Sequence, residues 1–217
     1  MVKEKKESFF WTSYSDLMTS LFFVMLVLFV LTVVLLKKRA IASEEAIKRV
    51  NEVTEGLKKL NKQYYSYDDV TKRYKLNVDI QFLPNQAIIE SANGFRPNED
   101  NLIKAGRDLY SLMNSITKKN ANINYLLIVE GNTQRSQNNF RLRPDVGYKL
   151  SYERALALVN FWKKSHIDFD EFKNCEILIC GSGYFGKSRT PMRGITDPAS
   201  NRKFSIQITP KIGKIEI

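Results

Sequence analysis

Residues 9–36 read FFWTSYSDLMTSLFFVMLVLFVLTVVLL, and this stretch decides how the rest of the chain is organised. Its last twenty residues, 17–36, carry no charge. At about 1.5 Å of rise per residue, a helix of that length reaches roughly 30 Å, the thickness of a bilayer's hydrocarbon core. Lys37-Lys38-Arg39 follows in place of a small-residue cleavage site, so the run is not a cleavable signal peptide. The stretch therefore predicts one retained transmembrane helix, which we place at residues 9–37.

Asp16 is the ionisable side chain at the head of this run. Thr12 and Ser13 lie one helical turn before it, and Thr19 and Ser20 lie one turn after it, so all four hydroxyls share its helix face. A carboxylate beside a membrane span is costly unless it faces a protein interior or a wet cavity. The polar stripe predicts an ion path in which Asp16 is the ion-carrying residue. The alternative is that Asp16 caps the helix N-terminus, where the helix dipole favours an anion.

Length and charge bound the remaining possibilities. The chain has 217 residues, enough for one span and one domain of ordinary size, and its formal net charge is +11. Charges in residues 1–16 cancel, so the excess lies after the span. The basic residues are dispersed and no nucleic-acid motif accompanies them, so we expect a solvated surface and no nucleic-acid partner.

Few side chains suggest covalent or metal chemistry. No nucleophile–base constellation is evident, so we expect no enzyme activity. His166 has no second histidine or thiolate pair near it in the sequence and reads as a surface residue at a helix end. Cys175 and Cys180 flank a strand-like run, which would separate them by roughly 16 Å on opposite faces. A disulfide needs Cα atoms within about 7 Å, so we expect two free thiols and no metal site.

Residues 38–66 continue the helix without an intervening proline. Apolar residues recur there at heptad spacing: Ala46, Val50, Val53, Leu57, Leu60 and Tyr64. This pattern predicts a short coiled-coil-like helix that pairs two copies of the chain. The alternative is one amphipathic helix that lies on its own domain.

Residues 74–212 have the pattern of a globular domain. Its alternation of apolar and polar residues predicts a hairpin over 76–82 and 86–90, a helix over 95–116, strands at 125–129 and 176–179 with a helix over 150–162 between them, and a last strand over 202–208. Strands alternating with helices indicate an α/β fold, an α+β sandwich with helices on one face of a mixed sheet.

The segment FWTSYSDLMT at residues 10–19 resembles the membrane signature of MotB-type stator subunits. The resemblance implies that Asp16 carries H⁺ or Na⁺, with no other cofactor, and that a homodimer sits inside a ring of a MotA-like channel subunit. The same stretch resembles the stator-like subunit of Zorya-type anti-phage motors. The downstream task is therefore either flagellar-like or antiviral defence.

Four later motifs resemble the OmpA-like peptidoglycan-binding domain: Gly131-Asn132-Thr133-Gln134, Leu150-Ser151-Tyr152-Glu153-Arg154-Ala155, Gly181-Ser182-Gly183 and Asn201-Arg202-Lys203. The resemblance implies peptidoglycan-binding candidates: Asn132, Thr133, Gln134, Leu150, Ser151, Arg154, Asn201 and Arg202. In that family an Asp and the Arg of the second motif grip the diaminopimelate of the wall peptide. Here Gln134 stands in the Asp position and Gly147 stands where the family usually has Asn. Gln134 accepts hydrogen bonds but brings no charge, so we expect wall binding to be weakened.

The sequence gives conflicting indications of which end of the chain lies on the cytoplasmic side of the membrane. Three lysines precede the span and five basic residues follow it closely, which favours a cytoplasmic C-terminus. The resemblance implies the reverse: a cytoplasmic tail at residues 1–8, a helix across the bacterial inner membrane and a periplasmic domain. Two alternatives stay open, an OmpA-like peptidoglycan tether with a non-conducting anchor and a cytoplasmic nucleic-acid binder.

Overall fold

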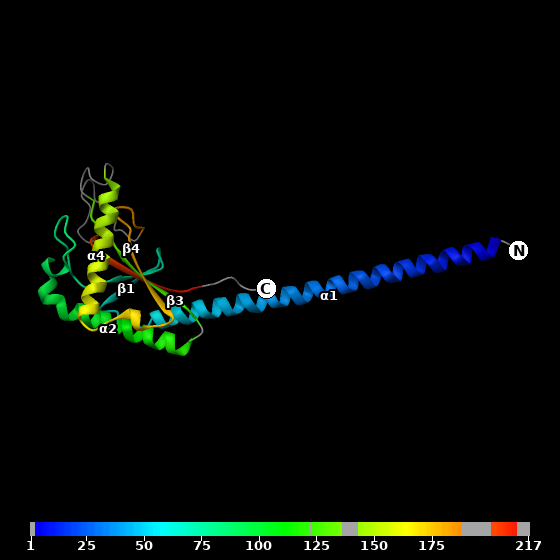
Figure 1. Ribbon diagram of the computed structural model, residues 1–217, viewed down its shortest axis with the longest axis horizontal. Helices are drawn as coiled ribbons and strands as arrows, with labels where there is room; N and C mark the ends of the chain where they lie inside the picture. The colour runs from blue at the N-terminus through cyan, green and yellow to red at the C-terminus, as the bar shows by residue number, and fades with distance from the viewer. Residues whose placement is uncertain (1–2, 122, 136–142, 188–200, 212–217) are drawn as a thin grey trace. The chain divides into compact units, whose positions relative to one another are not determined.

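The computed structural model describes residues 3–121, 123–135, 143–187 and 201–211 (Figure 1). The chain divides into two compact units. The first, which we call the anchor helix, is the part of helix α1 that ends at Arg49, and the second, which we call the domain, is Val50–Lys211.

Helix α1 runs over Lys3–Leu57. Large apolar side chains between Leu17 and Leu36 are exposed around the whole helix, a pattern typical of a membrane span. In the part of the chain that the structure describes, one helix is long and apolar enough to cross a membrane: Phe10–Glu44, which contains an 18-residue window with a mean hydropathy of 2.9. The expected tail at 1–8 is helical from Lys3 onward, because no proline or glycine interrupts the chain there.

The domain is built on a five-stranded mixed sheet with the order β1-β2-β5-β3-β4. Its strands, in chain order, are β1 (Tyr65–Asp68), β2 (Arg73–Leu76), β3 (Tyr125–Gly131), β4 (Cys175–Gly181) and β5 (Phe204–Pro210). β3 and β4 are parallel, and the other neighbouring strands are antiparallel. The parallel pair requires a crossover, which helix α4 (Pro144–Lys164) supplies.

The two faces of the sheet differ in chemistry. Tyr74, Ile206 and Val129 lie in register and are buried under the helices. The opposite face is largely polar, with Lys75 paired to Asp68 at 2.7 Å. The sequence prediction of helices packed on one face of a mixed sheet is therefore confirmed.

Helix α2 (Phe95–Lys119) and α4 form the covering layer, and α2 crosses the C-terminal part of α4 (Figure 1). The indole nitrogen of Trp162 donates to the carbonyl of Leu102 at 3.0 Å. Along α2 the fully buried residues recur every three or four positions: Leu102, Ala105, Leu109 and Met113. This stripe is the amphipathic pattern expected of the helix predicted over residues 95–116.

The predicted hairpin over 76–82 and 86–90 is wrong. The hairpin of this sheet is β1–β2, closed by a turn in which the Asp68 carboxylate accepts from Val70 N and Thr71 N. After Leu76 ends β2, residues 77–90 contain only an isolated bridge from Gln81 to Asn93 and the start of the short helix η1 (Ile89–Ser91). The sequence alternates there because this irregular loop inserts apolar side chains into the core. The loop does not form a strand pair at Pro84, because proline cannot donate a backbone hydrogen bond to a strand ladder.

The heptad pattern of residues 46–64 also has a different cause from the predicted pairing. Val53, Leu57, Leu60 and Tyr64 are buried in the core of their own domain. They are therefore not available to a second copy, which contradicts the predicted dimer seam at these four positions. Val50 is exposed, and the side chain of Ala46 lies outside the described residues.

The helix ends at Leu57, next to Gly56, rather than near residue 66. Because the core takes residues from position 53 onward and β1 begins at Tyr65, the domain begins well before the predicted boundary at residue 74. Packing explains why the end of α1 belongs to the domain. Gly56 faces the Ile116 side chain on α2, and the small glycine lets the end of α1 lie against that helix.

The cysteines and the histidine lie as the sequence predicted. Cys175 and Cys180 are free thiols at the two ends of β4. Burial raises the pKa of Cys175 to about 11 and raises that of Cys180, so neither is an activated thiolate. His166 is exposed just after α4, with a φ of 60°.

The domain boundary gives a direct test of the core. A fragment of residues 50–217 should unfold cooperatively, whereas residues 66–217 should be destabilised by about 5 kcal/mol or more, because Val53, Leu57 and Leu60 each lose a full burial. Thermal unfolding followed by circular dichroism would measure the difference. Equal melting temperatures for the two fragments would show that residues 50–65 do not belong to the domain.

Candidate functional site

Two regions contain the residues singled out from the sequence. The first surrounds Asp16 on the anchor helix. Because α1 is continuous there, Thr12, Ser13, Thr19 and Ser20 share the helix face of Asp16, and the Asp16 side chain is exposed on that face.

The hydroxyls around Asp16 are partly satisfied by the helix itself. Thr19 Oγ1 donates to the carbonyl of Ser15 at 2.7 Å, and Ser20 Oγ donates to the carbonyl of Leu17 at 2.8 Å. Each oxygen keeps lone pairs for a further donor or a cation. The geometry is that of a carboxylate beside hydroxyl acceptors, and the role of these residues in ion passage stays a prediction.

The second region lies at the C-terminal ends of β3 and β4. Here α4 approaches the sheet so closely that two positions require glycine. A Cβ on Gly131 would lie 2.0 Å from Ser151 O, and one on Gly181 would lie 2.3 Å from Ser151 Oγ. The Ser151 hydroxyl also accepts from Gly183 N at 2.9 Å. Glycine therefore sets the distance between α4 and the strand ends.

Four of the predicted site residues form the frame of this region. Asn132, Thr133, Ser151 and Asn201 are all buried. Asn132 Oδ1 accepts from Ser182 Oγ at 2.5 Å, and Thr133 N donates to Gly183 O at 3.2 Å. The Asn132 side chain and the Thr133 backbone thus connect the segment after β3 to the turn after β4. Leu150 and Gln134 are half-buried beside them.

Arg154 and Arg202, which we call the arginine pair, both donate hydrogen bonds to backbone carbonyls of the loop at residues 82–86. Arg154 donates to Gln86 O at 3.0 Å and to Leu83 O at 3.3 Å, and Arg202 donates to Phe82 O at 2.8 Å. The Arg154 guanidinium also lies 4.9 Å from the centre of the Phe82 ring, a cation–π contact. The structure thus brings these two candidates together and gives both a structural partner that the sequence did not reveal.

Arg154 is the chemically distinctive member of the pair. It is only 2% exposed, and burial together with the charge of Arg202 lowers its pKa to about 10, so it stays cationic at neutral pH. Among the described residues its Nη1 has no hydrogen-bond acceptor, and neither arginine forms an ion pair with a described carboxylate. Two adjacent guanidiniums with an unused donor are suited to a carboxylate or another anion.

Two residues, Gly147 and Gln134, depart from the OmpA-like motifs, and the structure gives a packing reason for the first. Gly147 is explained: a Cβ there would lie 2.4 Å from the Tyr184 ring, so the buried tyrosine occupies the space of any larger side chain. Gln134 lies three residues after the end of β3 and is half-buried.

A buried polar network beneath the site was not predicted. Arg73 forms an ion pair with Glu130, whose Oε2 also accepts from Ser205 Oγ at 3.1 Å. Asn132 Nδ2 in turn donates to Ser205 Oγ at 3.3 Å. Glu130 immediately precedes the Gly131 motif and is an acid inside an apolar run, which is the signal that could have found it.

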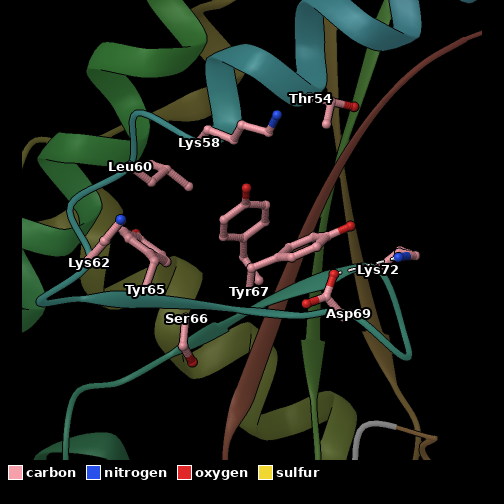
Figure 2. A pocket seen from close by; sticks show the side chains of 10 residues that line it. Thr54, Lys58, Leu60, Lys62, Tyr65, Ser66, Tyr67, Asp69 and Lys72 are labelled. Carbon is pink, nitrogen blue, oxygen red and sulfur yellow. Dashed lines mark ion pairs between the residues drawn. The ribbon is translucent and has the colours of Figure 1, made fainter.

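A separate cavity of about 550 Å³ lies between the end of α1 and the β1–β2 hairpin, and Figure 2 shows its lining. Aromatic and basic side chains predominate there: Lys58, Lys62, Tyr65, Tyr67, Lys72 and Tyr74. Lys58 pairs with Glu55, Lys72 pairs with Asp69, and the Tyr65 hydroxyl donates to Ala105 O. Its lining shares no residue with the arginine pair. No cluster of three or more His, Cys, Asp or Glu suited to a metal lies among the described residues.

Comparisons with known proteins give structural neighbours only. No family model matches the chain, and no curated protein is similar to it. It is similar to a MotB-like protein from Desulfovibrio vulgaris, with 12% identity, 83% of this chain and 99% of that one covered, and a TM-score of 0.41. It is also similar to the periplasmic domain of Helicobacter pylori MotB, with 8% identity, 70% and 91% coverage and a TM-score of 0.39. A third similar structure is the OmpA-like domain of FopA1 from Francisella tularensis, with 16% identity, 67% and 77% coverage and a TM-score of 0.35.

These neighbours are of the protein classes that the sequence motifs resemble. Their identities and TM-scores are too low to assign a ligand or an activity to this chain. Any function therefore has to rest on the chain's own residues.

The glycine at the α4 contact can be tested against a second glycine. Gly181→Ala should lower the unfolding free energy by about 1–3 kcal/mol, because the new methyl would lie 2.5 Å from Tyr152 N, a backbone atom. Gly56→Ala should raise it by roughly 0.5–1 kcal/mol, because there the nearest atoms belong to the adaptable Ile116 and Leu112 side chains. Melting temperatures that move in the same direction for both variants would contradict this reading of the contact.

Proposed function

We propose that this chain is the ion-carrying and wall-anchoring subunit of an ion-driven membrane motor. Two copies would sit inside a ring of a MotA-like channel subunit in the bacterial inner membrane, with the N-terminus cytoplasmic and the domain periplasmic. The observation that carries the proposal is the position of Asp16, which shares one helix face with four hydroxyls at the head of the uncharged run of residues 17–36. A plain anchor has no need of an acid in that place.

The mechanism needs only the titration or ion loading of Asp16. An incoming H⁺ or Na⁺ neutralises the carboxylate, and its release to the other side restores the charge. Each change alters how Asp16 interacts with the surrounding ring and biases one arrangement of the ring over another. No bond to substrate forms, so the proposed activity is transport and anchoring rather than catalysis. The motor's task, flagellar-like or anti-phage as in Zorya-type systems, is not specified by this site.

The pairing of two copies has to involve surfaces other than the buried face of residues 53–64. The exposed apolar side chains of the anchor helix are the surface that supports it. The arrangement lets the two Asp16 carboxylates act alternately.

The arginine pair supports the second half of the proposal, attachment of the domain to the peptidoglycan. Arg154 offers a buried cationic donor for the carboxylate of a wall peptide. Gln134 brings no charge for the peptide's ammonium, so the proposed binding is weak. A wall tether without ion transport is the rival function, and the satisfied hydroxyls of Thr19 and Ser20 are the observation in its favour.

Substitutions on the anchor helix separate the motor from the tether. With the channel partner co-expressed, Asp16→Asn should reduce ion flux to below about a tenth while the protein still assembles, because Asn cannot cycle its charge. Thr19→Val should reduce flux, and Thr32→Val should not. The last two are matched, because each hydroxyl donates to the carbonyl four residues earlier at 2.7 Å, but Thr32 lies off the Asp16 face. Full flux in Asp16→Asn would exclude the ion-carrying role.

Wall attachment is tested by sedimenting the full-length protein with purified sacculi. Gln134→Asp should increase binding by supplying a charge for the ammonium, and Gln63→Asp, an exposed position away from the site, should not. Arg154→Ala should lose binding worth about 1.5–3 kcal/mol. Arg154→Lys, which keeps the charge, separates that loss from any destabilisation of the loop. If neither wild type nor Gln134→Asp binds sacculi, the domain has another partner.

A further inference from the structure

Beside the arginine pair lies a group of exposed aromatic side chains that the proposed function does not use. Tyr148 and Tyr152 project from the first turns of α4, one turn apart, and Phe185 follows β4. They are 46%, 44% and 48% exposed. Exposed aromatic residues gathered at one place indicate a contact surface more often than scattered ones do.

Tyr148 and Phe185, which we call the aromatic pair, are held in place by the backbone. Their ring centres are 6.1 Å apart with an angle of 31° between the planes. Gly183, with a φ of 56°, turns the chain against α4 so closely that its Cβ would lie 3.1 Å from Tyr148. Phe185 N then donates to Ser182 O at 3.1 Å and closes the turn. The rings therefore form a preorganised surface and not two independent side chains.

Tyr184 connects the aromatic pair to the arginine pair. Its ring lies 6.4 Å from that of Phe185, and its buried hydroxyphenyl group acts electrostatically on Arg154. Its carbonyl accepts from Arg135 Nε at 2.8 Å, and the Arg135 guanidinium lies 6.0 Å from the centre of the Phe185 ring. Tyr184 thus lies between Arg154 on one side and the Phe185 ring with the Arg135 cation on the other.

We propose that the aromatic pair stacks against a sugar ring, so that the ligand of this site is a glycan-linked peptide rather than a free peptide. This inference rests on the proposed wall attachment and adds to it a contact with the sugar part of the peptidoglycan. A pyranose has a face of C–H groups, which suits the negative face of an aromatic ring, while its hydroxyls and carboxyl substituents remain at the rim. Arg135 and the arginine pair provide the cationic rim that a sugar bearing an acidic peptide requires.

The test uses the full-length protein in detergent micelles and two probes from purified sacculi. One is the disaccharide–peptide released by a muramidase, and the other is the same peptide freed of sugar by an amidase. Wild type should bind the disaccharide–peptide more tightly than the peptide. Tyr148→Ala and Phe185→Ala should each raise the Kd for the disaccharide–peptide roughly 2- to 12-fold, the range of one aromatic contact, without changing the Kd for the peptide.

Three controls make the result specific. Tyr148→Phe and Phe185→Tyr keep the rings and should bind as wild type does. Tyr67→Ala removes a similarly exposed ring from β1, outside the site, and should have no effect. Unchanged melting temperatures would exclude loss of folding in the alanine variants.

The outcomes separate this inference from the proposed function. If wild type binds both probes equally, or the alanine variants weaken both alike, the sugar contact is overturned while wall attachment stands. If wild type binds neither probe, the sugar contact and the proposed wall attachment are both overturned. If the alanine variants instead lower self-association of the protein in sedimentation, the surface pairs two copies of the chain and the sugar contact is overturned.

Discussion

The domain depends on the close approach of α4 to the ends of the two parallel strands. Ser151 lies against Gly131 and Gly181 at distances that leave no room for a side chain. This contact brings Arg154 over the loop at residues 82–86 and places Tyr148 beside the turn after β4. Arg154 and Tyr148, the α4 members of the two pairs, therefore owe their positions to one helix–sheet distance, and a residue that widened it would move both.

The Arg154 guanidinium holds a loop and also keeps one donor unused among the described residues. Two of its donors hold the carbonyls of Leu83 and Gln86, and a third, Nη1, has no acceptor among the described residues. A buried polar group of this kind has a high free-energy cost unless it is satisfied. Because Arg202 holds Phe82 in the same loop, any ligand that draws Arg154 outward is linked to the conformation of residues 82–86.

The sequence predicted the elements whose pattern is local, and it failed where distant residues decide the outcome. The apolar run, the α2 stripe, the strands at 125–129 and 176–179 and the helix between them follow from local patterns, and the structure confirms them. The heptad pattern of residues 46–64 was ambiguous, because a helix that packs on its own domain has the same spacing as one that pairs with a copy. The burial of Val53, Leu57, Leu60 and Tyr64 in the core of their own domain resolves it. The hairpin was misplaced because the apolar side chains of an irregular loop imitate the alternation of a strand.

In the candidate site, too, the sequence predicted what local motifs encode and missed what depends on contacts between distant residues. Motif matching located Arg154, Asn132 and Arg202, but it could not show that the arginines already hold a loop, or that Glu130 and Arg73 form a buried pair beneath them. The aromatic pair joins residues far apart in the sequence, and no spacing rule connects Tyr148 with Phe185.

The absence of a break in α1 before Gly56 has a mechanical consequence. The backbone is helical from Lys3 to Leu57, and its last turns belong to the domain core through Val53 and Leu57. A helix stretches far less under tension than a disordered tether, because each turn is closed by hydrogen bonds along its axis. Residues 3–57 therefore contain no unstructured linker that tension along the chain could lengthen.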